Sequence, residues 1–132
     1  RSVMLYVVSC GHDEYDEGQS PIIHLVSSID SIIASGRPWF FTDRHADLSY
    51  SIQYESVVDL HNVDFSVMRL RYWSDHDIKE KRQAEFLVHD WCPWSAIEAI
   101  IVMDESIKNR VEIELQQSSH VPNVYIDTEC YY

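Results

Sequence analysis

An acidic residue within an otherwise apolar stretch is the first feature of this chain that suggests chemistry. Residues 84–89, A-E-F-L-V-H, alternate in a way that predicts a strand in which Glu85 shares a face with Leu87. A carboxylate on a partly apolar face must be paired, exposed at an edge or used in a reaction. Gln83 lies two residues earlier and is predicted to point the same way. Glu85 is therefore a candidate catalytic carboxylate, with a solvated edge-strand glutamate as the alternative.

A cluster of basic residues precedes this strand. Five of the ten Lys and Arg residues lie within residues 69–82, beside only three acids, whereas the whole chain has a net charge of -12. The overall charge argues against a general polyanion binder, but screening over about 8 Å allows a local cationic groove to persist. The cluster predicts a nucleic-acid contact, with a solvated helix face and loop as the alternative. Its members are Arg69, Arg71, Lys79, Lys81 and Arg82.

Composition limits the class of protein. With 132 residues and 45% hydrophobic content, the chain suits one domain with its own core. No apolar run approaches the roughly 20 residues of a membrane helix, and no signal peptide is recognisable. The three cysteines are widely spaced without a C-x-x-C pair, which favours a reducing cytoplasm. We therefore expect a soluble, cytoplasmic protein, and the first residue, Arg1, fits a fragment or a processed piece.

Metal and phosphate motifs are missing from the sequence. D-H-D at residues 75–77 is a poor metal site because three consecutive side chains rarely point at one ion. The chain has seven histidines but no H-x-x-x-H or H-E-x-x-H spacing, so a histidine-dependent hydrolase or metal enzyme is a remote alternative. Three glycines exclude a Gly-rich phosphate cradle. We expect no metal.

Local patterns place these candidates on elements in the first two thirds of the chain. The acidic stretch 12–20 reads as a surface loop, and residues 22–26 as a central strand with His24 as a satisfied core imidazole. Ser27 or Ser28 caps a short helix through Ala34, which Gly36 ends. The strand 38–42 leads into D-R-H, residues 43–45, with a helix start capped by Asp43 and an exposed Arg44 as the alternative. Helical spacing covers 46–73, with Asp64 as an internal cap, and a polar turn follows at 73–77.

The last third predicts a strand, a helix and a final strand. Residues 97–103 form a buried strand in which Glu98 is a second acid and a decoy for Glu85. Asp104 caps a helix that reaches about Gln117, with an apolar stripe at positions 107, 111 and 115. Residues 122–127 form the final strand.

Several motifs in one order carry a resemblance to a known family. R-Q-A-E-F-L-V followed by P-W-S-A-I-E is similar to the C-terminal part of the DarT-type DNA ADP-ribosyltransferase toxins, which use NAD to modify thymidine in single-stranded DNA. Further similar segments are R-S-V-M-L-Y, G-Q-S-P-I-I-H-L-V-S-S, F-F-T-D-R-H-A, M-R-L-R-Y-W and the terminal Y-Y. The matches extend over nearly the whole chain, which makes them more specific than any single motif.

The resemblance implies a fold and a function. It implies an α+β, ADP-ribosyltransferase-like mixed sheet core with flanking helices, truncated at the N-terminus, so that residues 1–132 form one partial domain. The family's His-rich NAD-binding strand and catalytic arginine have no counterpart in these residues. The expected co-substrate is NAD, the expected acceptor is single-stranded DNA, and the expected partner is a macrodomain antitoxin. A truncated, non-catalytic scaffold that binds nucleic acid or a protein is the alternative.

The resemblance also implies roles for residues. Glu85 would be catalytic, stabilising the oxocarbenium-like transition state and orienting or deprotonating the thymine nitrogen. Residues 1–9 would form a short helix behind the active site, and residues 46–73 the segment that selects the acceptor. Tyr72 and Trp73 would stack on an unpaired base or close the helix onto the core. The residues expected to bind DNA or substrate are Arg1, Met4, Arg44, His45, Lys79, Lys81, Arg82 and Gln83.

Overall fold

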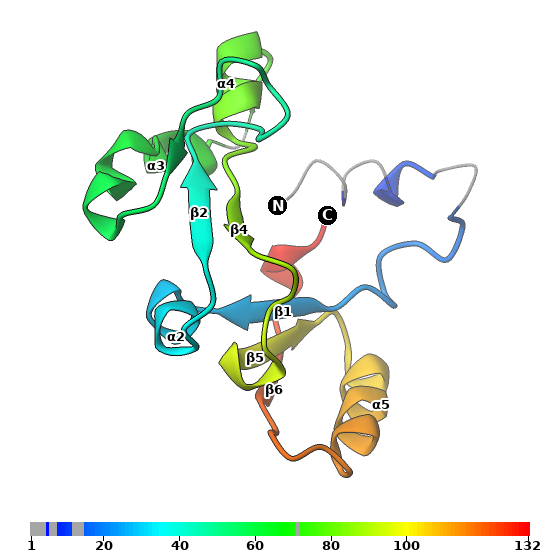
Figure 1. Ribbon diagram of the computed structural model, residues 1–132. Coiled ribbons are helices and arrows are strands. Elements are labelled where there is room, and N and C mark those ends of the chain that lie inside the picture. The colour runs from blue at the N-terminus through cyan, green and yellow to red at the C-terminus, as the bar shows by residue number, and fades with distance from the viewer. Residues whose placement is uncertain (1–4, 6–7, 12–14, 71) are drawn as a thin grey trace. The chain divides into compact units, whose positions relative to one another are not determined.

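The computed structural model describes residues 5, 8–11, 15–70 and 72–132, which form two compact units. One unit combines the residues before Ile32 with those after Cys92, and the other comprises Ile32–Cys92. Each unit contains one three-stranded sheet (Figure 1). Helices accompany both sheets, so the α+β fold class predicted from the sequence is confirmed. That the two units belong to a single domain stays a prediction.

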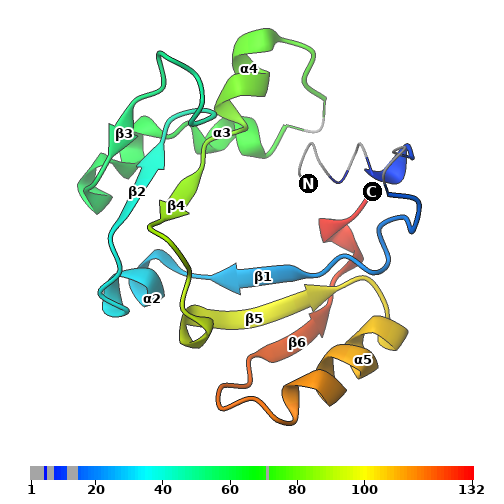
Figure 2. The ribbon, with the colours of Figure 1, turned by 45° about the vertical axis from the view of Figure 1, so that its right-hand side comes forward.

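The first unit is built on a mixed sheet with the strand order β1-β5-β6. Strand β1 (His24–Ser27) runs antiparallel to β5 (Ile97–Val102), and β6 (Asn123–Ile126) runs parallel to β5. Parallel neighbours need a crossover connection, which α5 (Glu105–Leu115) supplies beside β5 and β6 (Figure 2). The strands predicted at 97–103 and 122–127 are therefore confirmed.

The core of this unit joins β5 to α5. The inward side chains of β5 meet the stripe of α5, and Ile100 and Val102 are almost completely buried, at 1% and 0% exposure. Val111 and Val124 pack against this cluster. The predicted apolar stripe of α5 is thus confirmed. The buried members of the cluster are Ile97, Ile100, Val102, Ile107 and Leu115.

Among the described strands, β1 lies at the edge of its sheet and not in the predicted central position. In the described part of the chain it pairs with β5 alone, and Leu25 on its outer face is 52% exposed. Its apolar composition suggested two buried faces, but the number of partner strands depends on the rest of the sheet. His24 packs edge-on against Tyr131, with ring centroids 4.9 Å apart, and burial lowers its pKa. Its buried Nε2 finds no hydrogen-bond partner among the described residues, so the imidazole is not satisfied as expected.

The N-terminal cap of α5 gives the first testable prediction. Asp104 accepts hydrogen bonds from the Ser20 hydroxyl at 2.7 Å and from the Ile107 N–H at 3.0 Å, and these lower its pKa. A carboxyl with a lowered folded-state pKa contributes stability above its unfolded pKa, and this stability is lost as the pH falls through the folded value. We expect Asp104→Asn to lower the melting temperature at pH 6. On acidification below about pH 4, the melting temperature of the variant should then fall less than that of the wild type.

Thermal unfolding of the chain across pH 2.5–7 measures this effect. Asp30→Asn is the matched control, because Asp30 is exposed in the first turn of a different helix, α2 (Ile29–Ala34). An unchanged acid dependence in Asp104→Asn would contradict the prediction.

The predicted boundaries of α2 are confirmed, since the Ser28 hydroxyl accepts from the Ser31 N–H at 3.1 Å and Gly36 adopts a φ of +70°.

The second unit is built on an antiparallel sheet in which β2 (Trp39–Thr42) lies between β3 (Gln53–Tyr54) and β4 (Phe86–Val88) (Figure 2). Aromatic pairs join the strands. The rings of Trp39 and Phe86 stack at 5.2 Å, and those of Phe41 and Tyr54 at the same separation. These pairs fix β2 against both neighbours, so the end of β2 and the start of β4 lie side by side.

The segment between β2 and β4 is less helical than predicted. Residues 46–73 contain β3, a 3-10 helix at Val57–Asn62 and the four-residue helix α3 (Phe65–Met68). Pairing of Gln53–Tyr54 with β2 overrides the helical spacing, and such long-range pairing is invisible to a local pattern. Asp64 does cap α3, since it accepts from the Ser66 N–H at 3.1 Å.

A helix also replaces part of the predicted polar turn at 73–77. Helix α4 (His76–Lys81) begins after Asp75, whose carboxylate accepts from the Ile78 N–H at 3.2 Å. Further 3-10 helices occupy Trp94–Ala96 and Thr128–Cys130. Within the described ranges, no helix combines the length and the apolar character needed to cross a bilayer.

Candidate active site

Glu85 lies immediately before β4 rather than inside a strand. The chain leaves α4, turns at residues 82 and 83, and reaches Glu85 opposite the end of β2. The Thr42 N–H donates to the Glu85 carbonyl at 2.9 Å, and the Glu85 N–H donates to the Thr42 hydroxyl at 3.1 Å. Thr42 is fully buried, so this pairing fixes the backbone of Glu85. The predicted strand therefore starts two residues later than expected, and Gln83 lies in the turn.

The carboxylate of Glu85 is held at one oxygen and open at the other. Its Oε2 accepts the Ala46 backbone N–H at 3.0 Å, and the residue is half-buried. Its Oε1 accepts no hydrogen bond from the described residues. A carboxylate oriented by one backbone donor, with the second oxygen available, can stabilise a developing positive charge or accept a proton. The geometry differs from that of a freely solvated edge-strand glutamate.

The loop after β2 supplies the donor for Glu85. Asp43, Arg44 and His45 lead from the end of β2 to Ala46, as the predicted position of D-R-H at a strand end required. The His45 Nδ1 accepts the Asp47 N–H at 3.2 Å, and His45 is half-buried. His45 directly precedes Ala46, whose N–H binds the Glu85 carboxylate. His45 therefore lies at the same end of the sheet as Glu85.

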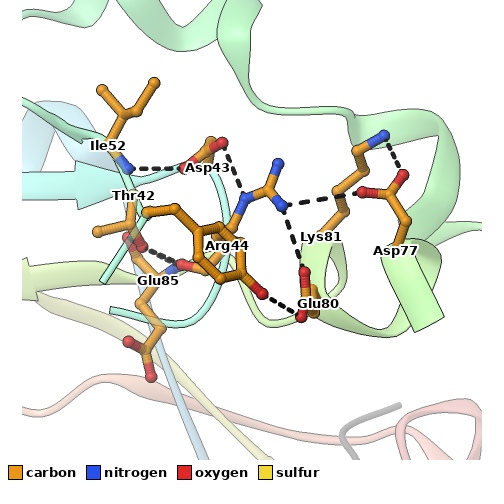
Figure 3. Close-up of polar contacts among 9 residues, drawn as sticks. Thr42, Asp43, Arg44, Ile52, Asp77, Glu80, Lys81 and Glu85 are labelled. Atoms are coloured by element: carbon orange, nitrogen blue, oxygen red, sulfur yellow. Dashed lines mark hydrogen bonds and ion pairs between the residues drawn. The ribbon is translucent and has the colours of Figure 1, made fainter. Parts of the chain in front are cut away.

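Arg44 lies in a network of acidic residues. Its Nε contacts the Asp43 carboxylate at 3.1 Å, and its Nη1 contacts Glu80 at 3.3 Å (Figure 3). Burial disfavours its charged form, but the hydrogen bond to Asp43 and the charges of Asp43, Asp77 and Glu80 outweigh burial and raise its pKa. Its side chain is only 18% exposed. The Arg44 charge is therefore largely compensated by carboxylates of the protein itself.

The four other candidates that follow α3 have different surroundings. Lys79 is exposed and takes part in no ion pair among the described residues, whereas Lys81 pairs with Asp77 at 2.5 Å. The Arg82 guanidinium donates to the carbonyls of α3, including that of Val67 at 2.7 Å. Gln83 donates to the Lys79 carbonyl at 3.2 Å. Part of the expected cationic groove is thus compensated within the protein, whereas Lys79 and Arg69 are exposed and form no ion pair among the described residues.

The remaining candidates divide between exposed, packed and undescribed positions. Tyr72 is 88% exposed and can stack on a planar ligand. Trp73 is half-buried, with the Arg82 guanidinium 5.0 Å from its ring centroid, which matches the alternative in which this aromatic closes onto the protein. Arg1 and Met4 lie outside the described residues, as does Arg71 of the basic cluster.

Glu98, the second acid predicted within a strand, is bound by two neighbouring serine side chains. The hydroxyls of Ser28 and Ser31 both donate to its Oε1, and these hydrogen bonds lower its pKa. Glu98 is exposed on β5, within the first unit. Among the residues that the structure describes, no three His, Cys, Asp or Glu side chains gather in a way that could hold a metal ion.

Sequence reasoning missed the groups that hold Glu85. The Ala46 N–H is a backbone donor with no side-chain signature, so no residue pattern could identify it. Thr42 gave a weak signal as a β-branched polar residue at the end of an apolar strand. Tyr50 and Glu80 carry no signal either, because only the folded loop brings the Tyr50 hydroxyl within 2.5 Å of Glu80.

Comparison with solved structures finds the same fold in a known protein. The structure superimposes with a TM-score of 0.94 on that of Thermus sp. 2.9 DarT in complex with ADP-ribosylated ssDNA, at 38% identity over 99% of this chain and 64% of that chain. The same protein in complex with NAD+ also gives 0.94 and 38%, over 99% of this chain and 68% of that chain. The fold is therefore that of the matching part of Thermus sp. 2.9 DarT.

The family follows from the sequence match. Residues 1–132 match the model of the family described as ssDNA thymidine ADP-ribosyltransferase, DarT, and the chain belongs to this family. A DNA ADP-ribosyl transferase of Thermus sp. (strain 2.9) is 39% identical over 135 residues, which cover the whole of this chain. The chain spans 65% of the length of that relative.

Proposed function

We propose that this chain is part of an NAD-dependent enzyme that transfers ADP-ribose to thymidine in single-stranded DNA. The observation that carries the proposal is the carboxylate of Glu85, bound at Oε2 by the Ala46 N–H while its Oε1 accepts no hydrogen bond from the described residues. Membership of the DarT family supports the reaction class. The Thermus relative, solved with NAD+ and with ADP-ribosylated ssDNA, supports the co-substrate and the acceptor.

The reaction breaks the bond between nicotinamide and ribose. Nicotinamide leaves with the electron pair, the anomeric carbon forms a bond to a thymine nitrogen, and that nitrogen loses its proton. The transition state resembles an oxocarbenium ion, so a fixed carboxylate near the anomeric carbon stabilises it. We assign this role to Glu85, whose open Oε1 can also orient the incoming base or accept its proton. NAD is the co-substrate in this proposal, and no step requires a metal.

The binding site for the single-stranded DNA acceptor is assigned to the surface around α4 and the loop after β2. Lys79 contacts the DNA backbone, because it is exposed and unpaired among the described residues. Tyr72 stacks on an unpaired base, an interaction worth about 1–3 kcal/mol in single-strand channels. His45 positions the base next to Glu85. Arg1 and Met4 retain the binding role that the family resemblance implies.

The basic residues of α4 give a prediction that separates exposed from paired charges. We expect Lys79→Ala to weaken binding of a thymidine-containing oligonucleotide several-fold and to lower the salt slope by about 0.7, the value for one phosphate contact on a single strand. Lys81→Ala is the matched control on the same helix, and it should change the slope less because Asp77 already neutralises Lys81. Fluorescence anisotropy at several salt concentrations measures both. Equal slopes for Lys79→Ala and the wild type would contradict the assignment.

The proposed activity has a direct test. The full gene product that contains these 132 residues is incubated with labelled NAD and a single-stranded thymidine oligonucleotide, and label transfer is followed. Label on the thymidine oligonucleotide, absent from a matched cytidine oligonucleotide, is the expected result. A folded protein that binds the oligonucleotide without transferring label would favour the non-catalytic scaffold instead.

The proposal extends to the biological role of the protein. We infer that it is the toxin of a toxin–antitoxin pair and that its partner is a macrodomain protein that removes the modification. Family membership supports this assignment. Expression of the gene product in bacteria should stop growth, and co-expression of a neighbouring macrodomain protein should restore it.

A further inference from the structure

The Arg44 side chain is enclosed by acidic residues from two elements. Its guanidinium contacts Asp43 in its own loop, at 3.1 Å, and Glu80 of α4, at 3.3 Å. Asp77, also on α4, lies at 3.8 Å. The guanidinium further lies 5.3 Å from the ring centroid of Tyr50, whose hydroxyl donates to Glu80. A charge with this many carboxylate partners has little capacity left for DNA phosphates.

The same contacts fix both ends of the loop after β2. Asp43 accepts the Ile52 N–H at 3.0 Å, which closes the loop from residue 43 to residue 52. The Tyr50 hydroxyl and Arg44 then attach the closed loop to Glu80 of α4. Figure 3 shows the contact between Arg44 and Glu80. Asp43 and Glu80 are only 15% and 13% exposed, so their ion pairs with Arg44 are partly shielded from water. Arg44 is the group that the loop and the helix share.

Both attachments of Glu85 depend on these two elements. Ala46, which binds the Glu85 carboxylate, lies inside the loop, and the backbone of Glu85 follows α4 after a short turn. The Thr42 hydroxyl donates to the Arg44 carbonyl at 2.6 Å while it accepts the Glu85 N–H. Figure 3 shows the carboxylate of Glu85 directed away from the Arg44 guanidinium, so Arg44 acts on it through the loop rather than by contact.

We propose that Arg44 is a positioning residue, which joins the loop 43–52 to α4 through Asp43 and Glu80 and thereby holds the Ala46 N–H against the Glu85 carboxylate. The proposal rests on the proposed function as far as Glu85 is catalytic. Lysine cannot replace Arg44, because a single ammonium lacks the planar fork that reaches carboxylates in two elements at once.

The test separates positioning from DNA binding. Arg44→Gln and Arg44→Lys should each lower kcat about 10- to 100-fold, the cost of a small misplacement of a catalytic group. The affinity for the oligonucleotide should change less than about 3-fold, because Arg44 makes no DNA contact in this proposal. Glu80→Gln should lower kcat similarly, and the double variant should lose little more than either single variant. Arg110→Gln, at an exposed arginine of α5, is the control and should leave kcat unchanged.

A DNA-binding arginine would give the opposite pattern. Arg44→Gln would then weaken oligonucleotide binding and reduce its salt dependence, whereas Glu80→Gln would strengthen binding by removing a negative charge. That pattern would overturn the proposal. Should Arg44→Gln fail to fold, Tyr50→Phe, which removes only the hydroxyl bound to Glu80, replaces it and should show a smaller loss of kcat.

A second readout does not depend on activity. Hydrogen exchange of the Ala46 amide should accelerate in both Arg44→Gln and Glu85→Ala. The first variant loosens the loop that contains this amide, and the second removes the carboxylate that accepts its hydrogen bond. Amides of α5 in the first unit should be unchanged. If the wild-type protein transferred no label, the proposed function would fail, yet faster exchange in Arg44→Gln would still support the positioning role. Unchanged exchange of Ala46 in Arg44→Gln would overturn it.

Discussion

Replacing Glu85 with glutamine is expected to reduce transfer of labelled ADP-ribose to single-stranded thymidine by about 10²- to 10³-fold, the cost of removing one electrostatic stabiliser of a transition state. The glutamine amide oxygen can still accept the Ala46 N–H, so the side chain keeps its orientation and loses only its charge. The loss should appear in kcat, because the carboxylate interacts most strongly when positive charge develops at the anomeric carbon. Single-turnover transfer assays on the full gene product measure the effect.

Glu98→Gln is the matched control for this substitution. Glu98 is an exposed acid on β5, and its carboxylate is bound by Ser28 and Ser31. It should retain activity within about 3-fold of the wild type, as expected for a residue that makes no transition-state contact. Thermal unfolding of both variants verifies the fold. Full activity in a correctly folded Glu85→Gln variant would exclude a catalytic role for this carboxylate.

Truncation of Ile100 to alanine is expected to remove a large fraction of the free energy of unfolding of the chain. Ile100 is 1% exposed at the centre of β5, where it packs within the cluster shared with α5. Isoleucine-to-alanine substitutions in a packed core cost about 2–5 kcal/mol, because the cavity adds to the lost hydrophobic transfer energy. Domains are stable by only about 5–15 kcal/mol, so the variant should unfold at a much lower urea concentration.

Two further variants make this prediction specific. Ile100→Val should cost about 0.5–1.5 kcal/mol, in proportion to the smaller cavity. Ile113→Ala, at an isoleucine of α5 that is 61% exposed, should change the free energy of unfolding by less than about 0.5 kcal/mol. Urea unfolding of the 132-residue chain, followed by circular dichroism, compares the three. A cost below about 1 kcal/mol for Ile100→Ala would contradict the close packing of β5 against α5.

Local signals identified several elements because the forces that form them act over a few residues. Ser27 or Ser28, Asp64 and Asp104 were predicted as helix caps. Ser28 and the two aspartates each accept a backbone N–H two or three residues later. The stripe of α5 was predicted from its spacing and packs as expected. Glu85 was singled out because a carboxylate in an apolar stretch needs a partner, and the Ala46 N–H is that partner.

The sequence by itself therefore determined most strands, the caps and the candidate carboxylate, since each leaves a short-range pattern of polarity, whereas the α+β class followed from the resemblance of several motifs to a known family. Only the tertiary structure decided that β1 lies at a sheet edge, that Gln53–Tyr54 pairs with β2, and that Arg44 joins Asp43 to Glu80. These features depend on partners that are distant in sequence. No local pattern records them, because the free energy that selects them arises when the segments meet.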